Sequence, residues 1–558
     1  MENIIIVDAG STGHNLVEDA VRRGYRPIVI EPSHPGLREM RQETYRLFFR
    51  EVEIIPEKES YDDTLALAKG YSPVAVMAGS EDGVGLANRL AADLGLPGNP
   101  VSRLEAMTKK HAMHEALKQA GIRYIKGQKI TSTEEALAFC RENGLSSAVV
   151  KPIRSAGSQG LFLCDNLTEV EHAVDELLCM KDLYGDPITE AVVQERIVGV
   201  EYIVNTSSCN GVHHLNSVLR YKKQKTEEGG YIYDYAETIN HLEPGHTAMI
   251  EYAYQVADAI GVRNGLIHGE YMIDEKGPIL IEVNCRPMGA SMTAEFLDPI
   301  FGHHETDVLL DTLLGGEMFM QRQTEPYAPK YKGALKLIIV PKDFDAESHP
   351  IWEIARHLKS TYKISVQPED SMATYIKTRD LESAGGVIYM LHKDENVVMR
   401  ELNLLRRIEQ DYFNLLLSDG HARRWFIDAS IPAADPDELI RTYNCHGSVL
   451  IAVDEDQEVA GAQVVSPATL NDAHTGFDHV IIAYQKSLLE MNDPACIRLI
   501  FDTMDKVRPG GRVIIPKSTY RYMAYEQEGA EVLMQVKGLE ITAPMPGFNY
   551  LVIGTRRS

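Results

Sequence analysis

The first hundred residues alternate between short apolar runs and segments of helical periodicity. Apolar runs at residues 4–7, 27–30, 52–55 and 74–77 are typical of buried strands, and residues 15–23 are typical of a helix between the first two. Strand, helix and strand at this spacing predict a parallel sheet with crossover helices.

The turn after the first strand reads DAGSTG over residues 8–13. It has two glycines but lacks the GxGxxG pattern that brings a backbone close to a dinucleotide pyrophosphate. We therefore expect a Rossmann-like domain over residues 1–100 that does not bind NAD.

The charge balance limits the classes of partner. The chain has 558 residues and a formal net charge of −25. Such a surface repels phosphate backbones and anionic lipid, so we expect neither nucleic-acid nor membrane partners. No apolar run approaches the roughly 18 residues of a membrane span, and the first residues lack the basic character of a signal peptide. The seven cysteines are scattered and form no CxxC pair, which favours reduced thiols in a cytoplasmic protein.

At about 150 residues per domain, the length predicts about three or four domains. We expect a helix at residues 108–121 with Lys and His on its polar side, strands at 334–340 and 387–391, and a long helix at 397–417. The composition of residues 432–436 (PAADP) indicates a linker. The predicted fold class is a multidomain mixture of α/β and α+β domains.

Residues 266–289 hold the most informative chemistry. Two apolar runs flank a DEKG turn, a pattern that predicts a β-hairpin. Glu270 falls in its first strand, and Glu282 and Asn284 are two residues apart in the second, hence on one face. Two carboxylates and an amide oxygen suit Mg²⁺ better than zinc. Arg286 continues the same face and could bind a phosphate or carboxylate; a solvated hairpin face explains the pattern equally well.

Two further segments carry candidate phosphate and nucleotide contacts. An apolar strand delivers Lys151 to a Ser- and Gly-rich loop ending at Gly160, where small residues let backbone N–H groups approach phosphate. Residues 191–204 read as strand, short connector and strand, with Glu201 at the start of the second strand. Taken alone, each segment is also compatible with an ordinary turn or a solvent-facing glutamate.

In their order and spacing, these elements resemble the ATP-grasp superfamily. Residues 79–99 (GSEDGVGLANRLAADLGLPGN) and 219–224 (LRYKKQ) look most like carboxylate–amine ligases, including L-amino-acid (dipeptide) ligases. The resemblance covers roughly residues 1–420. It implies an ATP-grasp domain at 101–316, preceded by the Rossmann-like domain and followed by an α+β ligase domain at 317–430.

The resemblance also implies site residues. ATP would be bound by Lys110, Lys151, Ser155, Gly157, Ser158, Gly160, Gln194, Glu195, Ile197 and Glu201. Mg²⁺, with Mn²⁺ as an alternative, would be bound by Glu270, Glu282 and Asn284. The implied catalytic or substrate-handling residues are Arg286, Lys151, Arg220 and Lys223.

The chain departs from the family pattern at three places. The usual Asp-Lys of the first lysine motif reads Lys109–Lys110, which leaves open which lysine faces phosphate. Cys285 stands where the family usually has proline, and we expect it to be a packed thiol. Met288 replaces the first of two glycines after the arginine.

The implied reaction joins a carboxylate to an amine through an acyl phosphate and releases ADP and phosphate. Its substrates would be small molecules, with amino acids favoured, in small-peptide or natural-product biosynthesis. Alternatives are an ATP-grasp enzyme with bicarbonate or thiol as acceptor, a bifunctional ligase–methyltransferase, and a nucleotide-binding regulator without turnover. A homodimer is left open.

Residues 476–558 resemble the second half of an S-adenosylmethionine-dependent methyltransferase, with a helix ending in PGG at residues 509–511. The strand expected at 448–453 is not followed by a glycine loop. We therefore expect a degenerate methyltransferase-like domain at 431–558 that serves packing, dimerisation or docking.

Paired histidines at 111/114, 213/214 and 303/304 lack acidic partners at zinc spacing, so we expect surface or substrate-pocket roles for them. His268, in the first hairpin strand, is the histidine closest to the candidate metal ligands.

Overall fold

A computed structural model gives the fold of the chain. It describes residues 1–49, 52–153, 160–181, 185–225, 231–290, 292–345, 351–366, 374–381, 383–419, 440–441, 445–454, 459–484, 493–516, 534–542 and 550–556. The chain divides into two compact units, Met1–Leu335 with Arg379–Ser383, and Lys336–Thr378 with Ala384–Ser558. All the candidate site residues belong to the first unit.

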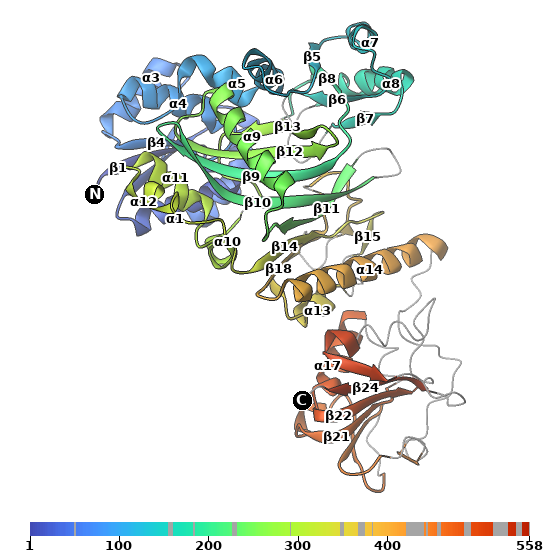
Figure 1. The fold of residues 1–558 in the computed structure, drawn as a ribbon. Coiled ribbons are helices and arrows are strands. Elements are labelled where there is room, and N and C mark those ends of the chain that lie inside the picture. The colour runs from blue at the N-terminus through green and yellow to red at the C-terminus, as the bar shows by residue number, and fades with distance from the viewer. Residues whose placement is uncertain are drawn as a thin grey trace. The chain divides into compact units, whose positions relative to one another are not determined.

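The first unit begins with a parallel sheet (Figure 1). Its strands are β1 (Asn3–Val7), β2 (Arg26–Glu31), β3 (Glu53–Pro56) and β4 (Ala75–Ala78), in the order β3-β2-β1-β4. Its helices are α1 (Asn15–Arg22), α2 (Pro35–Phe48), α3 (Tyr61–Gly70) and α4 (Gly83–Leu94). All three strand pairings are parallel, so the predicted parallel sheet is confirmed. Because alternate residues of β1 enter two separate apolar clusters, the sheet is covered on both faces.

A larger antiparallel sheet forms the centre of the first unit. Its strands follow the order β13-β12-β9-β10-β11, with β14 beside β11. They are β9 (Val200–Cys209), β10 (Val212–Lys225), β11 (Tyr231–Thr238), β12 (Gly265–Asp274), β13 (Gly277–Asn284) and β14 (Lys332–Leu337). Helix α9 (Pro244–Ile260) crosses one face (Figure 1), where Val256 packs against Tyr202 and Val204 of β9. The predicted hairpin is confirmed, and Gly277 at its turn has φ +102°, which favours glycine.

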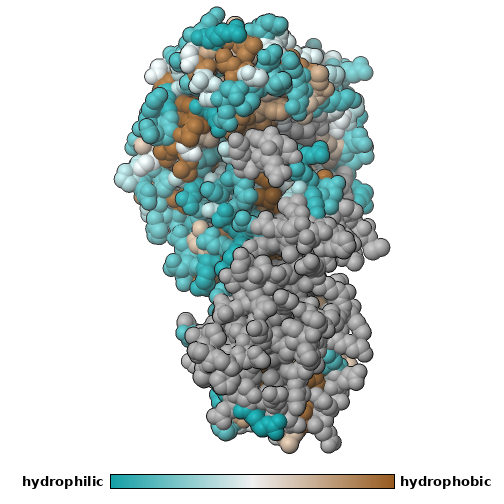
Figure 2. Space-filling model, turned by 90° about the vertical axis from the view of Figure 1, so that its right-hand side faces the viewer, coloured by the Kyte–Doolittle hydropathy of each residue, from teal (hydrophilic) through white to brown (hydrophobic). Residues whose placement is uncertain are grey.

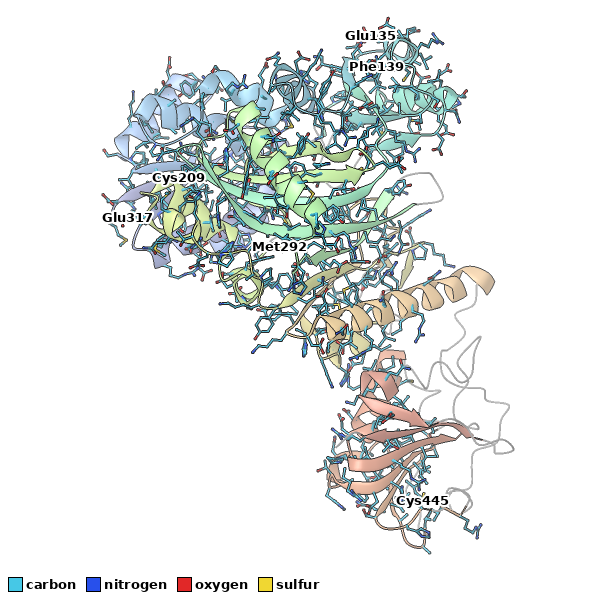
Figure 3. The ribbon with its side chains drawn as sticks, in the orientation of Figure 1. Glu135, Phe139, Cys209, Met292, Glu317 and Cys445 are labelled. Atoms are coloured by element: carbon cyan, nitrogen blue, oxygen red, sulfur yellow. The ribbon has the colours of Figure 1, made fainter. Side chains whose placement is uncertain are left out.

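A small sheet of order β5-β8-β6-β7 carries the second lysine candidate. Its elements are β5 (Gly127–Ile130), α7 (Thr133–Glu142), β6 (Ala148–Pro152), β7 (Phe162–Cys164), α8 (Leu167–Leu177) and β8 (Ala191–Glu195). Phe139 of α7 packs with α8 in the apolar core on one face (Figure 3). Glu135 closes the start of α7 by accepting a 2.7 Å hydrogen bond from Thr131 N. The helices therefore cover one face and leave the other for polar side chains.

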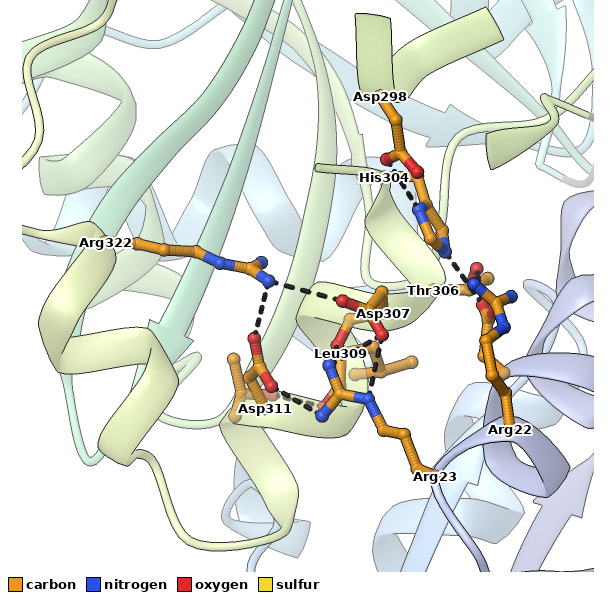
Figure 4. A network of polar contacts seen from close by, with 11 residues as sticks. Arg22, Arg23, Asp298, His304, Thr306, Asp307, Leu309, Asp311 and Arg322 are labelled. Carbon is orange, nitrogen blue, oxygen red and sulfur yellow. Dashed lines mark hydrogen bonds and ion pairs between the residues drawn. The ribbon is translucent and has the colours of Figure 1, made fainter. Parts of the chain in front are cut away.

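Three helices after the hairpin return to the N-terminal sheet. They are α10 (Ala294–Phe301), α11 (Glu305–Leu313) and α12 (Glu317–Arg322). Leu309 and Leu313 of α11 share an apolar cluster with Leu16 of α1. A polar network joins the same helices (Figure 4): Arg23, after α1, lies 2.6 Å from both Asp307 and Asp311.

His304 belongs to this network, so the expectation of a surface or substrate-pocket role for it is wrong. It is buried, with Nδ1 2.8 Å from Asp298 (Figure 4). Its Nε2 lies 3.1 Å from Asp19. Burial alone would lower the pKa of His304, but hydrogen bonds to the two carboxylates raise it to about 9. Spacing along the sequence does not indicate this pairing, because Asp19 and His304 are far apart in the chain.

The second unit contains the strand predicted at 387–391 and the long helix predicted at 397–417, whereas the strand predicted at 334–340 overlaps β14. Its first elements are β15 (Phe344–Asp345), α13 (Ile351–Arg356), β16 (Thr361–Val366), β17 (Thr374–Tyr375), β18 (Gly386–His392) and α14 (Glu395–Asp419). Lys336 and Glu409 form a buried ion pair of 2.6 Å between the end of β14 and α14. The linker predicted at residues 432–436 lies outside the described residues.

The C-terminal sheet has the order β20-β19-β21-β22-β24-β23. Its elements are β19 (Val449–Ala452), β20 (Gln463–Val465), β21 (Phe477–Ile482), α17 (Asp493–Met504), β22 (Val507–Pro516), β23 (Leu539–Thr542) and β24 (Tyr550–Arg556). The prediction of a helix ending in PGG is wrong, because α17 ends at Met504 and this segment lies within β22. Gly510 has φ +77°, and the ladder shifts register between Phe477 and His479, as in a β-bulge.

On the face drawn in Figure 2, hydrophilic residues surround scattered hydrophobic groups. Single exposed apolar residues such as Val198 and Met320 are normal on a folded protein. None of the helices in the described part of the chain is both long and apolar enough to cross a membrane.

Candidate functional site

One face of the large sheet is polar, and this follows from the alternation of side chains along its strands. Tyr202 and Val204 of β9 face α9, so Glu201 and Asn205 point to the opposite face. Glu270 is paired with Ile203 of the same strand and lies on that face. The candidate site is this polar face, which carries Glu201, Asn205 and Glu270.

The hairpin adds the other candidate metal ligands to this face. Glu270 is directly opposite Glu282, and His268 is directly opposite Asn284. His268 Nδ1 lies 2.8 Å from Asn205 Oδ1, and its Nε2 lies 3.8 Å from Glu270 Oε1. Burial lowers the pKa of His268 below its ordinary value, which favours a neutral ring that orients Glu270.

Lys110 reaches the hairpin from the start of a helix. Helices α5 (Leu104–Thr108) and α6 (Lys110–Gln119) are separated at Lys109, whose extended backbone has φ −116° and ψ 118°. This break turns Lys110 inward, where its Nζ lies 2.9 Å from Glu282 Oε2. Lys109 is half-exposed and pairs instead with Glu105 at 2.6 Å. Of the two lysines, the structure brings Lys110 to the site.

The expectation that Lys and His occupy the polar side of this helix is wrong at two positions. Lys110 and His114 are both buried. His114 accepts a hydrogen bond from Ile125 N and contacts Ile281 O, and burial lowers its pKa to about 3. Helical periodicity alone did not reveal that the large sheet covers this face.

Lys151 comes from the small sheet. It is paired with Val192 across the β6–β8 ladder, on the face opposite Val150 and Val193, which pack against α7 and α8. Burial lowers the pKa of Lys151 to about 8, an effect that the carboxylate of Glu282 opposes. Lys151 is therefore still mostly protonated at neutral pH, but less firmly than an exposed lysine.

The predicted adenine-side residues lie at the end of the small sheet. Gln194 is paired with Gly127 and Val149, on the face that carries Lys151. Its Nε2 is buried and has no hydrogen-bond partner. Glu195 Oε1 accepts a 3.2 Å hydrogen bond from Lys126 N. Ile197 lies in the connector between β8 and β9. The unused donor of Gln194 fits a nucleotide base with acceptor atoms.

Glu201 and Lys223 form a buried ion pair of 2.7 Å. Burial raises the pKa of Glu201 despite this partner, while Glu201 and Glu270 together raise the pKa of Lys223 against the effect of burial. Lys223 also lies 4.4 Å from the centre of the Tyr233 ring. The structure thus brings Lys223 to Glu201, the predicted ribose contact.

Arg220 lies on the same strand but has a different partner. Its Nε donates a 2.9 Å hydrogen bond to Glu237, whose other oxygen lies 2.7 Å from Lys332 Nζ. Sequence reasoning missed Glu237 and Lys332. Both are buried, and because β11 and β14 are neighbours, only the strand order reveals that they meet.

Arg286 lies beyond the end of β13, where the N-terminal sheet contributes Glu81. Arg286 Nε is 3.8 Å from Glu81 Oε2. Sequence reasoning missed Glu81, which lies in the turn between β4 and α4. The available signal was the strand order, because the carboxyl ends of β1 and β4 flank the position where a parallel sheet reverses its order and commonly binds ligands.

The segment after Arg286 is fixed from two sides. Glu305 of α11 accepts a short hydrogen bond from Met288 N. Thr12 Oγ1 accepts a 3.0 Å hydrogen bond from the backbone N–H of Met292 (labelled in Figure 3). Cys285 packs against apolar clusters on both sides, and burial raises its thiol pKa, as expected for a structural thiol.

The candidate metal ligands provide oxygen atoms only. In the described residues, no group of three or more His, Cys, Asp or Glu side chains is arranged to hold a metal ion. Two paired carboxylates, Glu270 and Glu282, with the amide of Asn284 on the same face, are nevertheless the donor types that Mg²⁺ prefers. The donor set therefore fits magnesium better than zinc.

The predicted phosphate loop is only partly described. Ser155, Gly157 and Ser158 lie outside the described residues. Gly160 is described and has φ +66°. The structure thus describes Lys151 and Gly160, which flank this motif on its two sides.

Parts of the chain are similar to known proteins. Residues 146–295 match the model of a family described as an ATP-grasp domain. The protein is an ATP-grasp ligase. It is 27% identical to dapdiamide A synthase of Enterobacter agglomerans, over 75% of this chain and 98% of that protein.

Two further ligases are similar to the chain. The alanine–anticapsin ligase of Bacillus subtilis is 24% identical to this chain. The matched region covers 47% of this chain and 58% of that protein. The crystal structure of an L-amino acid ligase from Bacillus licheniformis aligns with this chain with a TM-score of 0.57 at 17% identity. The alignment covers 73% of this chain and 97% of the chain in that structure. These similarities support the broad class of the chain, an ATP-grasp ligase that forms amide or peptide bonds.

Proposed function

We propose that this ligase activates a carboxylate with ATP as an acyl phosphate and transfers the acyl group to an amine, releasing ADP and phosphate. The substrates are small-molecule carboxylates and amines, chiefly amino acids, joined in small-peptide or natural-product biosynthesis. The observation that carries the proposal is the meeting of Lys110 with Glu282 beside Glu270, because this set can face phosphate and metal together.

Binding of ATP uses residues from both sheets. Lys151 and Lys110 approach the phosphates with positive charge, and the buried Gln194 amide donates to the base. Glu201 accepts from the ribose hydroxyls. Lys223 neutralises Glu201, which reduces the repulsion between that carboxylate and the phosphates.

Glu270, Glu282 and Asn284 would hold Mg²⁺, which supplies charge neutralisation for the transferring phosphoryl group. His268 fixes the orientation of Glu270 through the hydrogen bond to Asn205. Lys110 is close enough to Glu282 to move between that carboxylate and a phosphate oxygen.

The second half of the reaction takes place at Arg286. A guanidinium is permanently charged and can stabilise the oxyanion that develops when an amine attacks the acyl carbon. The hydrogen bonds from Met288 and Met292 to Glu305 and Thr12 hold the adjacent segment in place. No protein nucleophile is required for this chemistry.

The test measures ADP formation with a panel of amino-acid pairs and small carboxylic acids, with mass spectrometry of the products. The proposal expects ADP and condensed product in equal amounts. If ADP release requires a thiol or bicarbonate instead of an amine, the acceptor is not an amine and the proposed acceptor is wrong.

For residues 431–558 we propose a degenerate methyltransferase-like domain used for packing, dimerisation or docking. The supporting observation is a sheet in which β24 alone runs antiparallel to its neighbours among the described strands. Titration of the protein with S-adenosylmethionine by calorimetry tests this assignment. Binding in the micromolar range would favour a bifunctional enzyme instead.

A further inference from the structure

Glu81, beside Arg286 at the candidate site, has a carboxylate oxygen that accepts no hydrogen bond. Its Oε2 atom is buried and has no hydrogen-bond partner. The side chain as a whole keeps 34% of its surface exposed, so the carboxylate is open to a small molecule from one side. A buried acceptor without a donor is costly in a folded protein and calls for an explanation.

Both positively and negatively charged side chains surround Glu81. Arg286 Nε lies 3.8 Å away, too far for a hydrogen bond. Burial raises the pKa of Glu81 to about 7, although Arg286 and Lys110 act to lower it. The titratable or charged groups that influence Glu81 are Arg286, Lys110, Glu282, Asp82 and Cys285.

The position of Glu81 is set by backbone that cannot shift freely. It follows β4 and precedes α4, which begins at Gly83. A Cβ at Gly83 would lie 2.3 Å from Val7 O, and one at Gly79 would lie 2.6 Å from Asp8 O. The turn is thus packed tightly against the end of β1, and Glu81 is held next to Arg286 by close backbone contacts.

We propose that Glu81 binds the ammonium group of the amine substrate beside Arg286 and accepts the proton that the amine must lose before it attacks. The proposal rests on the proposed ligase function and narrows its substrate class to amines that are protonated at neutral pH, as amino acids are. An ammonium group that reaches the carboxylate from its exposed side supplies a hydrogen-bond donor to a group whose Oε2 atom has none.

The proton and electron balance is complete with the groups of the proposed reaction. An N–H bond of the ammonium breaks, and its proton moves to the Glu81 carboxylate. The nitrogen lone pair then forms the C–N bond to the acyl carbon, and the C–O bond to phosphate breaks with its electron pair on phosphate. The second proton of the nitrogen leaves with the phosphate. Glu81 returns its proton to solvent on its exposed side.

The test compares two nucleophiles in Glu81→Gln, which keeps the size of the side chain but cannot accept the proton. Hydroxylamine is already uncharged at neutral pH and reacts with an acyl phosphate without a base. With an amino acid as nucleophile, we expect kcat/KM to fall at least about 100-fold, the lower range for loss of a general base. With hydroxylamine, hydroxamate formation should stay within about threefold of the wild type.

Two further variants complete the design. Glu81→Asp retains the carboxylate, so its amino-acid rate should lie between those of the wild type and Glu81→Gln, with hydroxamate formation unchanged. Glu18→Gln removes an exposed carboxylate of α1 and should match the wild type with both nucleophiles.

The experiment distinguishes an error in the role of Glu81 from an error in the proposed ligase function. If wild-type protein forms neither ADP nor hydroxamate with any acid, the ligase proposal fails. If the wild type is active and Glu81→Gln keeps its amino-acid kcat/KM, or loses both nucleophiles equally, the role of Glu81 is overturned.

Discussion

Lys110 Nζ lies 2.9 Å from Glu282 Oε2, and this contact joins the start of α6 to the hairpin. Although burial favours the neutral carboxyl, Lys110 and Lys151 hold the pKa of Glu282 well below its usual range. Glu282 therefore remains ionised at neutral pH. An ionised carboxylate oxygen is a ligand that Mg²⁺ prefers.

Glu282→Gln should lower kcat for ADP formation by about 100- to 1000-fold, because it removes a negative charge from the proposed metal site at the transferring phosphoryl group. Steady-state kinetics across a Mg²⁺ titration measures this loss. Glu275→Gln, an exposed acid in the turn of the same hairpin, is the matched control. Turnover of Glu282→Gln at the control's rate would exclude the metal role.

Glu201→Gln should mainly weaken ATP binding, because it replaces the charged acceptor proposed for the ribose hydroxyls with a neutral amide and removes the negative charge 2.7 Å from Lys223. We expect KM for ATP to rise about tenfold, which is the effect of losing one charged hydrogen bond. Isothermal titration with ATP checks the result. An unchanged ATP affinity would mean that Glu201 does not contact the nucleotide.

The affinity for ATP should fall as the pH rises above about 8. Burial lowers the pKa of Lys151 to about 8, so its protonated form, which attracts phosphate, is lost through this range. Affinity should decrease by up to about tenfold per pH unit above 8, the limit for one linked proton. Lys151→Arg keeps its charge at high pH and should flatten this dependence. A wild-type affinity that stays constant from pH 7 to 9.5 would contradict the assignment.

The fold should lose stability through the ion pairs of His304 as the pH rises. Its pKa is raised from 6.5 to about 9 by Asp19 and Asp298 acting against burial, so the stabilisation is fully present below pH 6.5 and is lost through pH 9. The shift corresponds to about 3 kcal/mol. Thermal unfolding of wild type and His304→Gln should therefore differ most near pH 6 and converge near pH 10.

His172→Gln, at an exposed position on α8, is the control for removing a histidine. It should unfold like the wild type at every pH. A constant difference between wild type and His304→Gln from pH 6 to 10 would show that His304 contributes packing rather than charge.

Local sequence patterns were sufficient for the central elements. Period-two alternation predicted that Glu282 and Asn284 share a face, and the turn chemistry predicted the hairpin that pairs Glu270 with Glu282. The apolar runs of the first hundred residues predicted β1 to β4 because buried parallel strands are continuous and short.

Contacts between distant segments were not predictable in the same way. Glu81 meets Arg286, and Asp19 meets His304, across more than two hundred residues of chain. No local pattern records such a contact, because it depends on how sheets and helices pack. The burial of Lys110 has the same origin: a lysine at a helix start is usually solvated, and here the hairpin supplies its partner.

The proposed roles of the site residues share one requirement, which is that ATP cleavage is coupled to acyl transfer. The most direct measurement is ADP release from MgATP with one carboxylate, in the presence and absence of an amine, together with mass spectrometry of the product. The account predicts ADP release that depends on the carboxylate and yields one amide per ADP. Equal ADP release without any carboxylate, or ADP without a condensed product, would contradict it.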